Sequence, residues 1–492
     1  MPLILQSDEA TGPKRARRRM RRDPRPHFKT DHSAQLDALH GCPQLQVPSD
    51  HLARRVLGLI GKLSLSAVED RYSSLGRHGY SPRSVLAVWV YATLVGDHHA
   101  TKVATRLKTD AAYRLLSGGH AISGRTLRRF RQENGALFQA LIQQTVQMAM
   151  EQGLLDPTQL AVDSVRLRAH ASTAQVRTKE RSQARLQQLL QQAAQPRSPE
   201  EEKKYQAKVQ KHQQALARCA QTGRSNVVLS NPLAGLMKFP NGASQPGHRV
   251  TMTTVGKSTR LVLHVLWDAD GHDFGKLGPA LLGARKVLLQ SGLPPQTVLQ
   301  AAADAGYYSQ DDLLFGQQNA AWADLLIPER EPGGPNREQG KYFRAEQFQI
   351  GEDGTARCPA GRLMKGPYKD HPGCLRWQGQ GCGDCALRPQ CTSGKQRNLS
   401  YNVQMAELRR RMRQRMAQPG AEARYHQRLA TVEPVFSHLQ DQMGFRRLSS
   451  RHQQTVVAEI LLKVLAHNLS RLLAARPLRC VPCSIQLFWP TL

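Results

Sequence analysis

Three acidic side chains lie in sequence contexts that favour chemistry over a purely structural role. Asp163 lies inside an apolar, β-branched run, Asp304 follows a second such run in AAADAGYYS, and Glu433 lies in a helical stretch, TVEPVF. Carboxylate oxygens are the ligands that Mg²⁺ prefers, and two such ions can prepare an attacking oxygen and stabilise a leaving oxygen in phosphoryl transfer. Each acid also has a simpler interpretation, since Asp forms turns at strand ends and Glu before proline can end a helix. The fold must bring the three together for this chemistry.

A cluster of cysteines is the second candidate site. Cys382 and Cys385 form a C-x2-C pair, Cys391 follows closely, and Cys358 precedes them, with Cys374 as a fifth candidate. This spacing suits a tetrahedral four-thiolate Zn²⁺ site, and the alternative is a reduced thiol cluster without metal. Such a zinc would fold the surrounding segment and would not catalyse, because a structural site has no open coordination position. The remaining cysteines, Cys42, Cys219, Cys480 and Cys483, are scattered, and we assign the last two no function.

The charge balance indicates a polyanionic partner. Lys and Arg number 69 against 38 Asp and Glu, which gives a net charge of +31 and a sequence pI near 10.3. Nucleic acid is the leading partner for such a chain. We find no run of about 18 apolar residues and no signal peptide, so we expect no membrane association and a cytoplasmic, nucleoid-associated protein.

The first half of the sequence predicts a basic arm and a helical DNA-binding domain. Residues 1–49 are expected to form a disordered arm, and residues 50–155 show apolar positions at three- and four-residue steps, which is typical of helices. The segment Lys102–Arg131 resembles a helix-turn-helix with a Gly118-Gly119 turn and a second helix capped by Ser123 or Thr126. Its alternative is a solvated basic face. The predicted DNA contacts on this helix are Arg125, Arg128, Arg129 and Arg131.

The rest of the sequence predicts an α/β core with two insertions. A strand over 159–172 carries Asp163, and residues 248–330 alternate strands with helices, as in an α/β layer. Residues 176–222 read as a polar helical hairpin, which is either a spacer or an element that lies on DNA. The expected divisions are a core of 156–175 with 223–330, a Cys-rich insertion at 331–398, C-terminal core helices at 399–475 and a tail at 476–492.

The sequence resembles the bacterial insertion-sequence DDE transposases with an RNase H-like core, because several short motifs occur in the same order as in that family. They include LAVDSVRLRAHAS, GHDFGKL, ADAGYYS and TVEPVFSHLQDQMGFRRL, and the resemblance runs from about residue 50 to 475. It implies a five-stranded mixed sheet with helices, an acid on the first strand, an acid after the fourth, and a glutamate from a later helix. Two Mg²⁺ or Mn²⁺ ions are implied as cofactors. The implied reaction is cleavage at the terminal inverted repeats of double-stranded DNA and attack of the freed 3′ hydroxyls on target DNA, by a homodimer in the synaptic complex.

The helix around Glu433 departs from the family pattern at two points. Related transposases carry a tyrosine, an arginine, the glutamate and a lysine along this helix, and Tyr425 and Arg428 match the first two. The step from arginine to glutamate is one residue longer, which turns the side chain by about 100°. Gln440 takes the place of the lysine and cannot neutralise a phosphate. The DNA contacts that the resemblance implies here are Tyr425, Arg428 and, as substitutes for the lysine, Arg446 or Arg447.

Two further interpretations of the whole chain stay open at the level of sequence. One is a non-transposing nuclease on the same fold, and the other is an inactive, DNA-binding repressor derived from a transposase. Two side chains also have alternatives: Asp273 either supports the metal site or caps a helix, and His467 is interpreted as a packed helix residue in place of a ligand.

Overall fold

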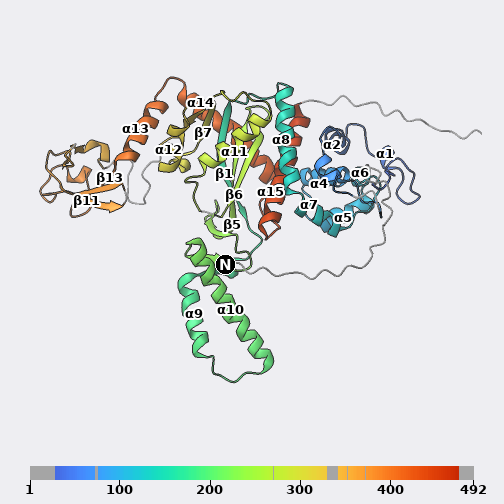
Figure 1. The fold of residues 1–492 in the computed structure, drawn as a ribbon, viewed down its shortest axis with the longest axis horizontal. Coiled ribbons are helices and arrows are strands. Elements are labelled where there is room, and N and C mark those ends of the chain that lie inside the picture. The colour runs from blue at the N-terminus through green and yellow to red at the C-terminus, as the bar shows by residue number, and fades with distance from the viewer. Residues whose placement is uncertain are drawn as a thin grey trace, which may run out of the picture.

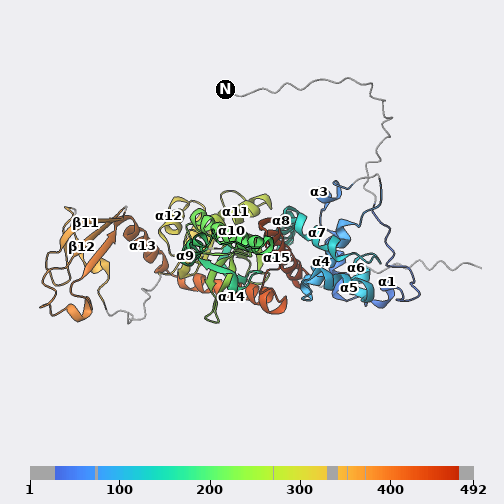
Figure 2. The same ribbon diagram turned by 90° about the horizontal axis from the view of Figure 1, so that it is seen from below.

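The computed structural model places three parts of the chain in a row (Figures 1 and 2). A helical domain lies at one end, a mixed sheet with helices in the middle, and a small cysteine-rich module at the other end. The structure describes residues 28–72, 76–269, 271–329, 342–351, 353–371 and 373–475. The first 27 residues of the predicted basic arm and the tail at 476–492 lie outside this description. Of the helices it does describe, none is long and apolar enough to span a membrane.

The N-terminal domain is all-helical, as predicted, and side-chain caps fix where its helices begin. The carboxylate of Asp110 accepts from the backbone N–H groups of Ala112 and Tyr113, and the Ser123 hydroxyl accepts from that of Thr126. Asp110 divides the first predicted helix of the helix-turn-helix into two. The elements are α1 (Pro43–Gln46), α2 (Leu52–Gly61), α3 (Ser66–Glu69), α4 (Pro82–Leu94), α5 (Ala100–Thr109), α6 (Ala111–Leu116), α7 (Gly124–Glu133) and α8 (Gly135–Glu151).

The described part of the predicted arm, residues 28–49, packs on this domain. Arg114 of α6 donates to the carbonyl of His40 at 3.0 Å and to the carboxylate of Asp37 at 3.2 Å. Cys42 is buried. We expected disorder as far as residue 49, and the structure differs because these local polar and apolar contacts fix the segment from residue 28 onward.

The central sheet is mixed, and its strand order is β6-β5-β1-β7-β8 with β4 beside the start of β5. β5 is antiparallel to β1, β4 and β6, whereas β7 is parallel to β1 and β8 is parallel to β7. We expected five strands and find six, because β5 extends beyond β6 and pairs there with β4. The strands are β1 (Gln159–Arg168), β4 (Gly235–Lys238), β5 (Ser244–Val255), β6 (Leu261–Asp268), β7 (Leu299–Ala303) and β8 (Ala323–Leu326).

Helices cover both sides of this sheet, and one of them joins it to the helical domain. Figure 2 shows α11 (Leu277–Gln290) and α14 (Ala421–Ser437) on opposite sides of the sheet. The long α15 (Gln453–Ala475) contacts α4, α7 and α8 of the helical domain as well as β6, so one continuous apolar core spans both parts. His467 of α15 is packed as predicted, with its ring bonded to His438 and to the carbonyl of Arg260.

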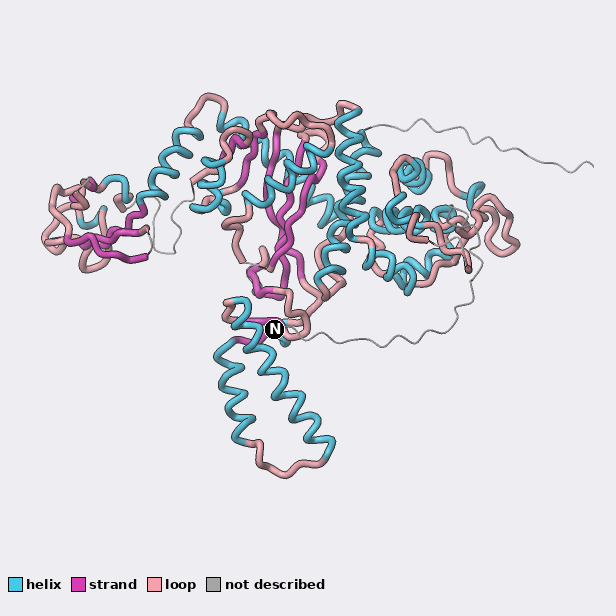
Figure 3. Tube along the Cα trace, in the orientation of Figure 1, coloured by secondary structure: helices cyan, strands magenta, loops and turns pink. Residues whose placement is uncertain are grey.

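The polar helical hairpin is also confirmed, and it projects away from the rest of the chain (Figures 1 and 3). It consists of α9 (Lys179–Gln191) and α10 (Pro199–Thr222), with a reciprocal Ser198 and Glu201 capping box at the start of α10. A small strand pair, β2 (Val176–Thr178) and β3 (Asn226–Val228), closes its base after the short 3-10 helix η1 (Thr173–Gln175).

The cysteine-rich module forms two small sheets around its own apolar cluster. Its strands are β9 (Gln349–Ile350), β10 (Ala356–Arg357), β11 (Lys365–His371), β12 (Cys374–Gln378) and β13 (Asn398–Asn402), with 3-10 helices η3 (Ala345–Gln347) and η4 (Arg388–Gln390). The chain then enters α13 (Val403–Met416), α14 and a π-helical turn, η5 (His438–Gln442). The core contributes η2 (Ala305–Tyr307) and α12 (Gln310–Gln318) ahead of the module.

Candidate active site

Asp163 lies at the middle of the sheet and forms an ion pair with a helix that crosses it. Arg428 of α14 donates from Nη1 to Asp163 Oδ2 at 2.8 Å, and the backbone N–H of Ser164 donates to Oδ1 at 2.7 Å. Burial and then the nearby carboxylate of Asp304 raise the pKa of Asp163 to about 6, against the opposing effect of Arg428. The side chain is therefore a carboxylate held in an environment that resists its negative charge.

Asp304 lies next to Asp163 because the parallel register of β1 and β7 fixes it there. Val162 pairs with Ala303, so the following residue of each strand is an aspartate. The Asp304 carboxylate accepts from the backbone N–H of Gly306 at 2.9 Å and so caps η2. Burial first, and the charge of Asp273, raise the pKa of Asp304. The two predicted strand acids are thus brought together.

A third aspartate, Asp273, also borders this site. Ser164 Oγ donates to its Oδ1 at 2.6 Å, and the guanidinium of the buried Arg249 bonds to the same oxygen. A Cβ atom on Gly306 would lie 2.9 Å from an Asp304 oxygen and 3.1 Å from an Asp273 oxygen, so both carboxylates crowd one glycine. The N-cap of α11 is Lys276, so Asp273 borders the acids and does not cap that helix through its side chain.

Tyr307 shows how closely the aspartates gather. Its ring is fully buried, and burial followed by the charges of Asp273, Asp163 and Asp304 raises its pKa well above the ordinary value. Sequence reasoning missed Arg249 and Tyr307 as members of this site. Tyr307 belongs to the ADAGYYS motif that contains Asp304, so the motif could have indicated that it lies at the site. Nothing near Arg249 in the sequence marks it as a partner for Asp273.

The structure does not bring Glu433 to the other two predicted acids. Glu433 is exposed on α14, whereas the buried face of that helix consists of Ala421, Arg428, Thr431, Val432 and Val435. Glu433 lies five positions after Arg428 on the α-helix, a step that turns its side chain about 140° away from that of Arg428. Within the described residues no three His, Cys, Asp or Glu side chains converge closely enough to hold a metal ion. The expected three-acid cluster is therefore absent from this conformation.

The other side chains predicted to act with Glu433 lie on α14 or in the segment that follows it. The guanidinium of Arg428 lies 5.8 Å from the ring of Tyr425, which is half-buried. Gln440 lies in the π-helical turn, and its carbonyl accepts from Arg446 at 3.2 Å. Arg446 also pairs with Asp441, and both Arg446 and Arg447 are exposed.

The predicted DNA-binding helix, α7, exposes three of its four arginines. Arg125, Arg128 and Arg129 lie at positions i, i+3 and i+4 on one exposed face. Arg131 is only 5% exposed and stacks over Trp89 with 4.9 Å to the ring centroid. The prediction for Arg131 was wrong.

The reason lies in the helical period. Arg131 follows Leu127 by one turn and so falls on the buried stripe with Phe130. Its guanidinium donates to the carbonyl of His98 and to Ser449 Oγ, both at 3.1 Å. The Ser449 hydroxyl is in turn within 3.0 Å of the Glu459 carboxylate on α15, so Arg131 joins α7 to the C-terminal helix that packs on the sheet.

Comparisons with known families match two separate parts of the chain. A family model described as "Transposase DDE domain" matches residues 357–473, and one described as "Transposase domain (DUF772)" matches residues 42–133. The two matches indicate an insertion-sequence DDE transposase. The first match includes Arg428 and Glu433 but neither Asp163 nor Asp304, and the second includes α7. No curated protein matches the chain.

DDE transposases generally use a divalent metal, and the aspartates fit one. Asp163 and Asp304 are adjacent oxygen donors: burial and then Asp304 raise the pKa of Asp163, and burial and then Asp273 raise the pKa of Asp304, so negative charges repel one another in this site. A bound cation would remove that repulsion. The donor chemistry therefore suits Mg²⁺ or Mn²⁺, although the described residues do not show a complete ligand set.

We expect the stability of the metal-free protein to fall with rising pH because of Asp163. Its folded pKa, about 6, lies above the ordinary aspartate value of 3.8, so its contribution is fully present below about pH 4 and is lost as pH rises through 6. The shift corresponds to about 2 to 3 kcal/mol. Thermal unfolding with and without MgCl2 should show a Mg²⁺-dependent rise in Tm that grows between about pH 5 and 7. Asp163→Asn should flatten that dependence, and an equal Mg²⁺ effect at every pH would contradict the assignment.

Proposed function

We propose that this chain binds the terminal inverted repeats of an insertion sequence and catalyses metal-dependent strand cleavage and strand transfer. The observation that carries the proposal is the adjacency of Asp163 and Asp304, which the register of β1 and β7 produces. The strand order β6-β5-β1-β7-β8, with β5 antiparallel and β7 and β8 parallel, supports an RNase H-like core. The two family matches support the element-end substrate.

In this proposal the aspartates bind metal, and neighbouring side chains hold the aspartates in place. Asp163 and Asp304 would supply oxygen ligands for two Mg²⁺ or Mn²⁺ ions, and such ions would supply Lewis-acid chemistry at the scissile phosphate. Arg428 holds Asp163 in place through its 2.8 Å bond. Arg249 and Ser164 hold Asp273 beside them. No covalent intermediate with the protein is required.

Two side chains, Glu433 and Asp273, are candidates for the third acidic metal ligand. Glu433 lies in the matched DDE segment and on the same helix as Arg428, but it faces away from Asp163 and would have to move when DNA and metal bind. Asp273 is already beside Asp304, but its charge is offset by Arg249. Glu433 remains the proposed third ligand, and Asp273 is its alternative.

The partners follow from the charge and the helical domain. Double-stranded DNA, at the element ends and at the target, is the proposed partner of the exposed face of α7, with Tyr425, Arg446 and Arg447 as further contacts. A net charge of +31 supports association with the nucleoid. Synapsis of two ends supports a homodimer. The proposed domain boundaries are those expected from sequence, with an ordered N-terminal part from residue 28.

The test is an in vitro excision assay with purified protein and Mg²⁺. The substrate is a plasmid carrying the gene with its flanking DNA, and excised linear element and joined products are scored. We expect cleavage at inverted repeats that bound the gene, and complete loss of it in Asp163→Ala. Glu433→Gln and Asp273→Asn, compared in the same assay, identify the third acid as the one whose loss abolishes cleavage.

The assay also separates this function from the two alternatives. Cleavage at the ends without joined products would indicate a nuclease. Specific binding to the ends without any cleavage would indicate a DNA-binding repressor derived from a transposase. In that case Gln440→Lys, which returns a cation to the π-helical turn, is the first change to examine for restored cleavage.

A further inference from the structure

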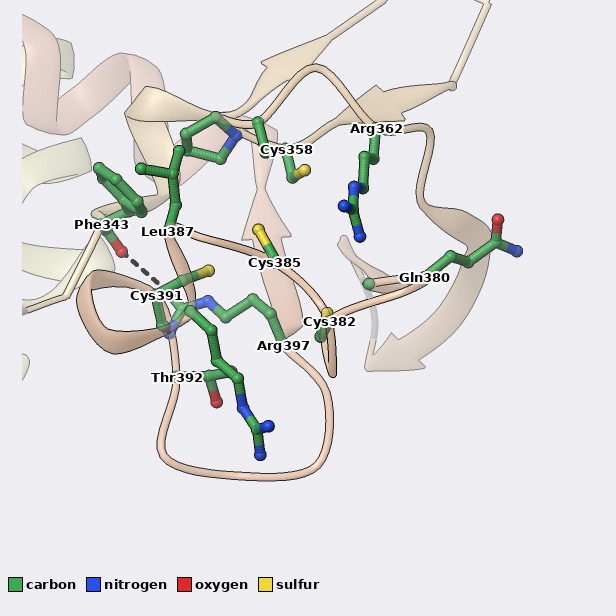
Figure 4. A pocket seen from close by; sticks show the side chains of 14 residues that line it. Phe343, Cys358, Arg362, Gln380, Cys382, Cys385, Leu387, Cys391, Thr392 and Arg397 are labelled. Atoms are coloured by element: carbon green, nitrogen blue, oxygen red, sulfur yellow. Dashed lines mark hydrogen bonds between the residues drawn. The ribbon is translucent and has the colours of Figure 1, made fainter.

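A pocket in the cysteine-rich module gathers four thiols from three separate stretches of chain (Figure 4). Figure 4 shows these side chains around one space with Arg362 and Arg397 beside them. The cavity measures about 20 Å³, which is room for one water-sized particle. We refer to this site as the thiol pocket, and it is formed by Cys358, Cys382, Cys385 and Cys391.

Tight turns and glycines in the backbone position Cys358 and Cys382 in the thiol pocket. The N–H of Cys358 donates to the carbonyl of Arg362 at 2.9 Å, and the N–H of Gly361 donates back to the carbonyl of Cys358 at 2.8 Å. Gly361 has a φ of 75°, which favours glycine. A Cβ on Gly379 would lie 2.7 Å from Cys382 Sγ, so the absence of a side chain there lets that sulfur approach.

The charged side chains that line the thiol pocket are all basic. Three arginines line it, Arg362, Arg388 and Arg397, and none of its lining residues is acidic. Four thiolates around a divalent ion carry a net negative charge, and the guanidinium groups offset it.

The module also needs a source of stability beyond its apolar core. In the described part of residues 342–402, the buried apolar cluster consists only of Phe348, Ala356, Met364, Trp377 and Leu399. Small units with so few buried side chains usually require a disulfide or a structural metal. The cysteines of the module are free thiols in this structure.

We propose that the thiol pocket binds one Zn²⁺ as a closed, four-thiolate structural site. The four sulfurs line the pocket, but no three of them converge closely enough to share an ion, so binding requires rotation of cysteine side chains. The ion would release the thiol protons on binding and would hold the turns at Cys358, Cys382 and Cys391 together. It takes no part in the proposed cleavage chemistry, and its test does not depend on that activity.

The test uses full-length protein purified from zinc-supplemented cells and measures metal content by mass spectrometry. We expect about one zinc per chain and near-complete loss of it in the Cys382→Ser/Cys385→Ser double variant. Cys374→Ser is the matched control, because Cys374 lies in the same module on β12 but does not line the pocket. It should keep its zinc. Absence of zinc from the wild-type protein, or equal loss in the control, would overturn the proposal.

A second measurement needs no variant and so does not depend on a variant folding. Wild-type protein is alkylated before and after zinc removal by a chelator, and the modified cysteines are located by peptide mass spectrometry. The four thiols of the pocket should be protected only while zinc is bound, whereas Cys374 should react in both samples. A disulfide within the pocket, or iron with sulfide in place of zinc, would refute a zinc site.

Discussion

Asp304→Asn should abolish cleavage of the element ends while leaving DNA binding unchanged. The substitution keeps the shape of the side chain, and the amide oxygen can still accept from the N–H of Gly306, so the cap of η2 is retained. It removes the negative charge that would hold a metal ion. Because metal ions supply several kcal/mol in phosphoryl transfer, the cleavage rate should fall at least about 1,000-fold. The rate is measured on supercoiled plasmid with Mg²⁺, and binding is measured by gel shift.

The control for this variant is Asp311→Asn, the same chemical change on the exposed start of α12. It should leave the cleavage rate within about twofold of wild type, as surface substitutions usually do. Thermal unfolding provides a second check, because removing one of three crowded negative charges should leave the Tm of Asp304→Asn unchanged or higher. Retained cleavage would show that Asp304 is not a ligand.

The acids on strands were predictable from sequence because the signal is local. A charged residue amid apolar strand formers needs a reason, which marked Asp163, whereas Asp304 was marked by its place at the end of a strand. Glu433 had no such signal beyond its resemblance to the family pattern. The sequence did show that its step from Arg428 is one residue longer than usual, and the structure shows the consequence, an arginine that faces Asp163 and a glutamate that faces away.

The contacts that join distant segments were not predictable from sequence. Asp273 and Arg249 meet through the packing of a loop against a strand, and Arg249 reads as an ordinary strand residue until its partner is known. Arg131 bonds to Ser449, more than three hundred residues away in the sequence. The spacing of Arg131 from Leu127 places it on the apolar stripe of α7 and predicts burial, whereas its charge alone predicts exposure.

The helical domain and the sheet share one apolar core, which fixes the position of α7 relative to the aspartates. α15 packs on α7 and also on β6, and Arg131 connects the buried side of α7 to Ser449 and Glu459. The exposed arginines of α7 are therefore held on a helix that is fixed relative to the aspartates. DNA bound on α7 would have a defined position relative to the catalytic half, which is what cleavage at a set distance from a recognised end requires.

Alanine at Arg125, Arg128 and Arg129 together should weaken binding to the element ends by roughly 100-fold at low salt. All three are exposed on one face of α7, while Leu127 and Phe130 hold the opposite face in the core, so the variant should fold normally. If each arginine neutralises one phosphate, the slope of log affinity against log salt concentration should also fall by about 3. Fluorescence anisotropy with labelled end DNA over a salt series measures both quantities.

The matched control removes two exposed arginines whose ion pairs are closer than the 3.8 Å pair of Arg129 with Glu133. Arg410 and Arg411 are exposed on α13, and each bonds to Glu407 at 2.7 Å, so alanine at both should change the salt slope little. Random DNA of equal length separates the two kinds of contact on α7, since loss of phosphate contacts weakens binding to both DNAs alike. A larger loss on the end DNA would show that α7 also contacts bases in the major groove. Unchanged affinity for both DNAs would remove α7 as the DNA-binding helix.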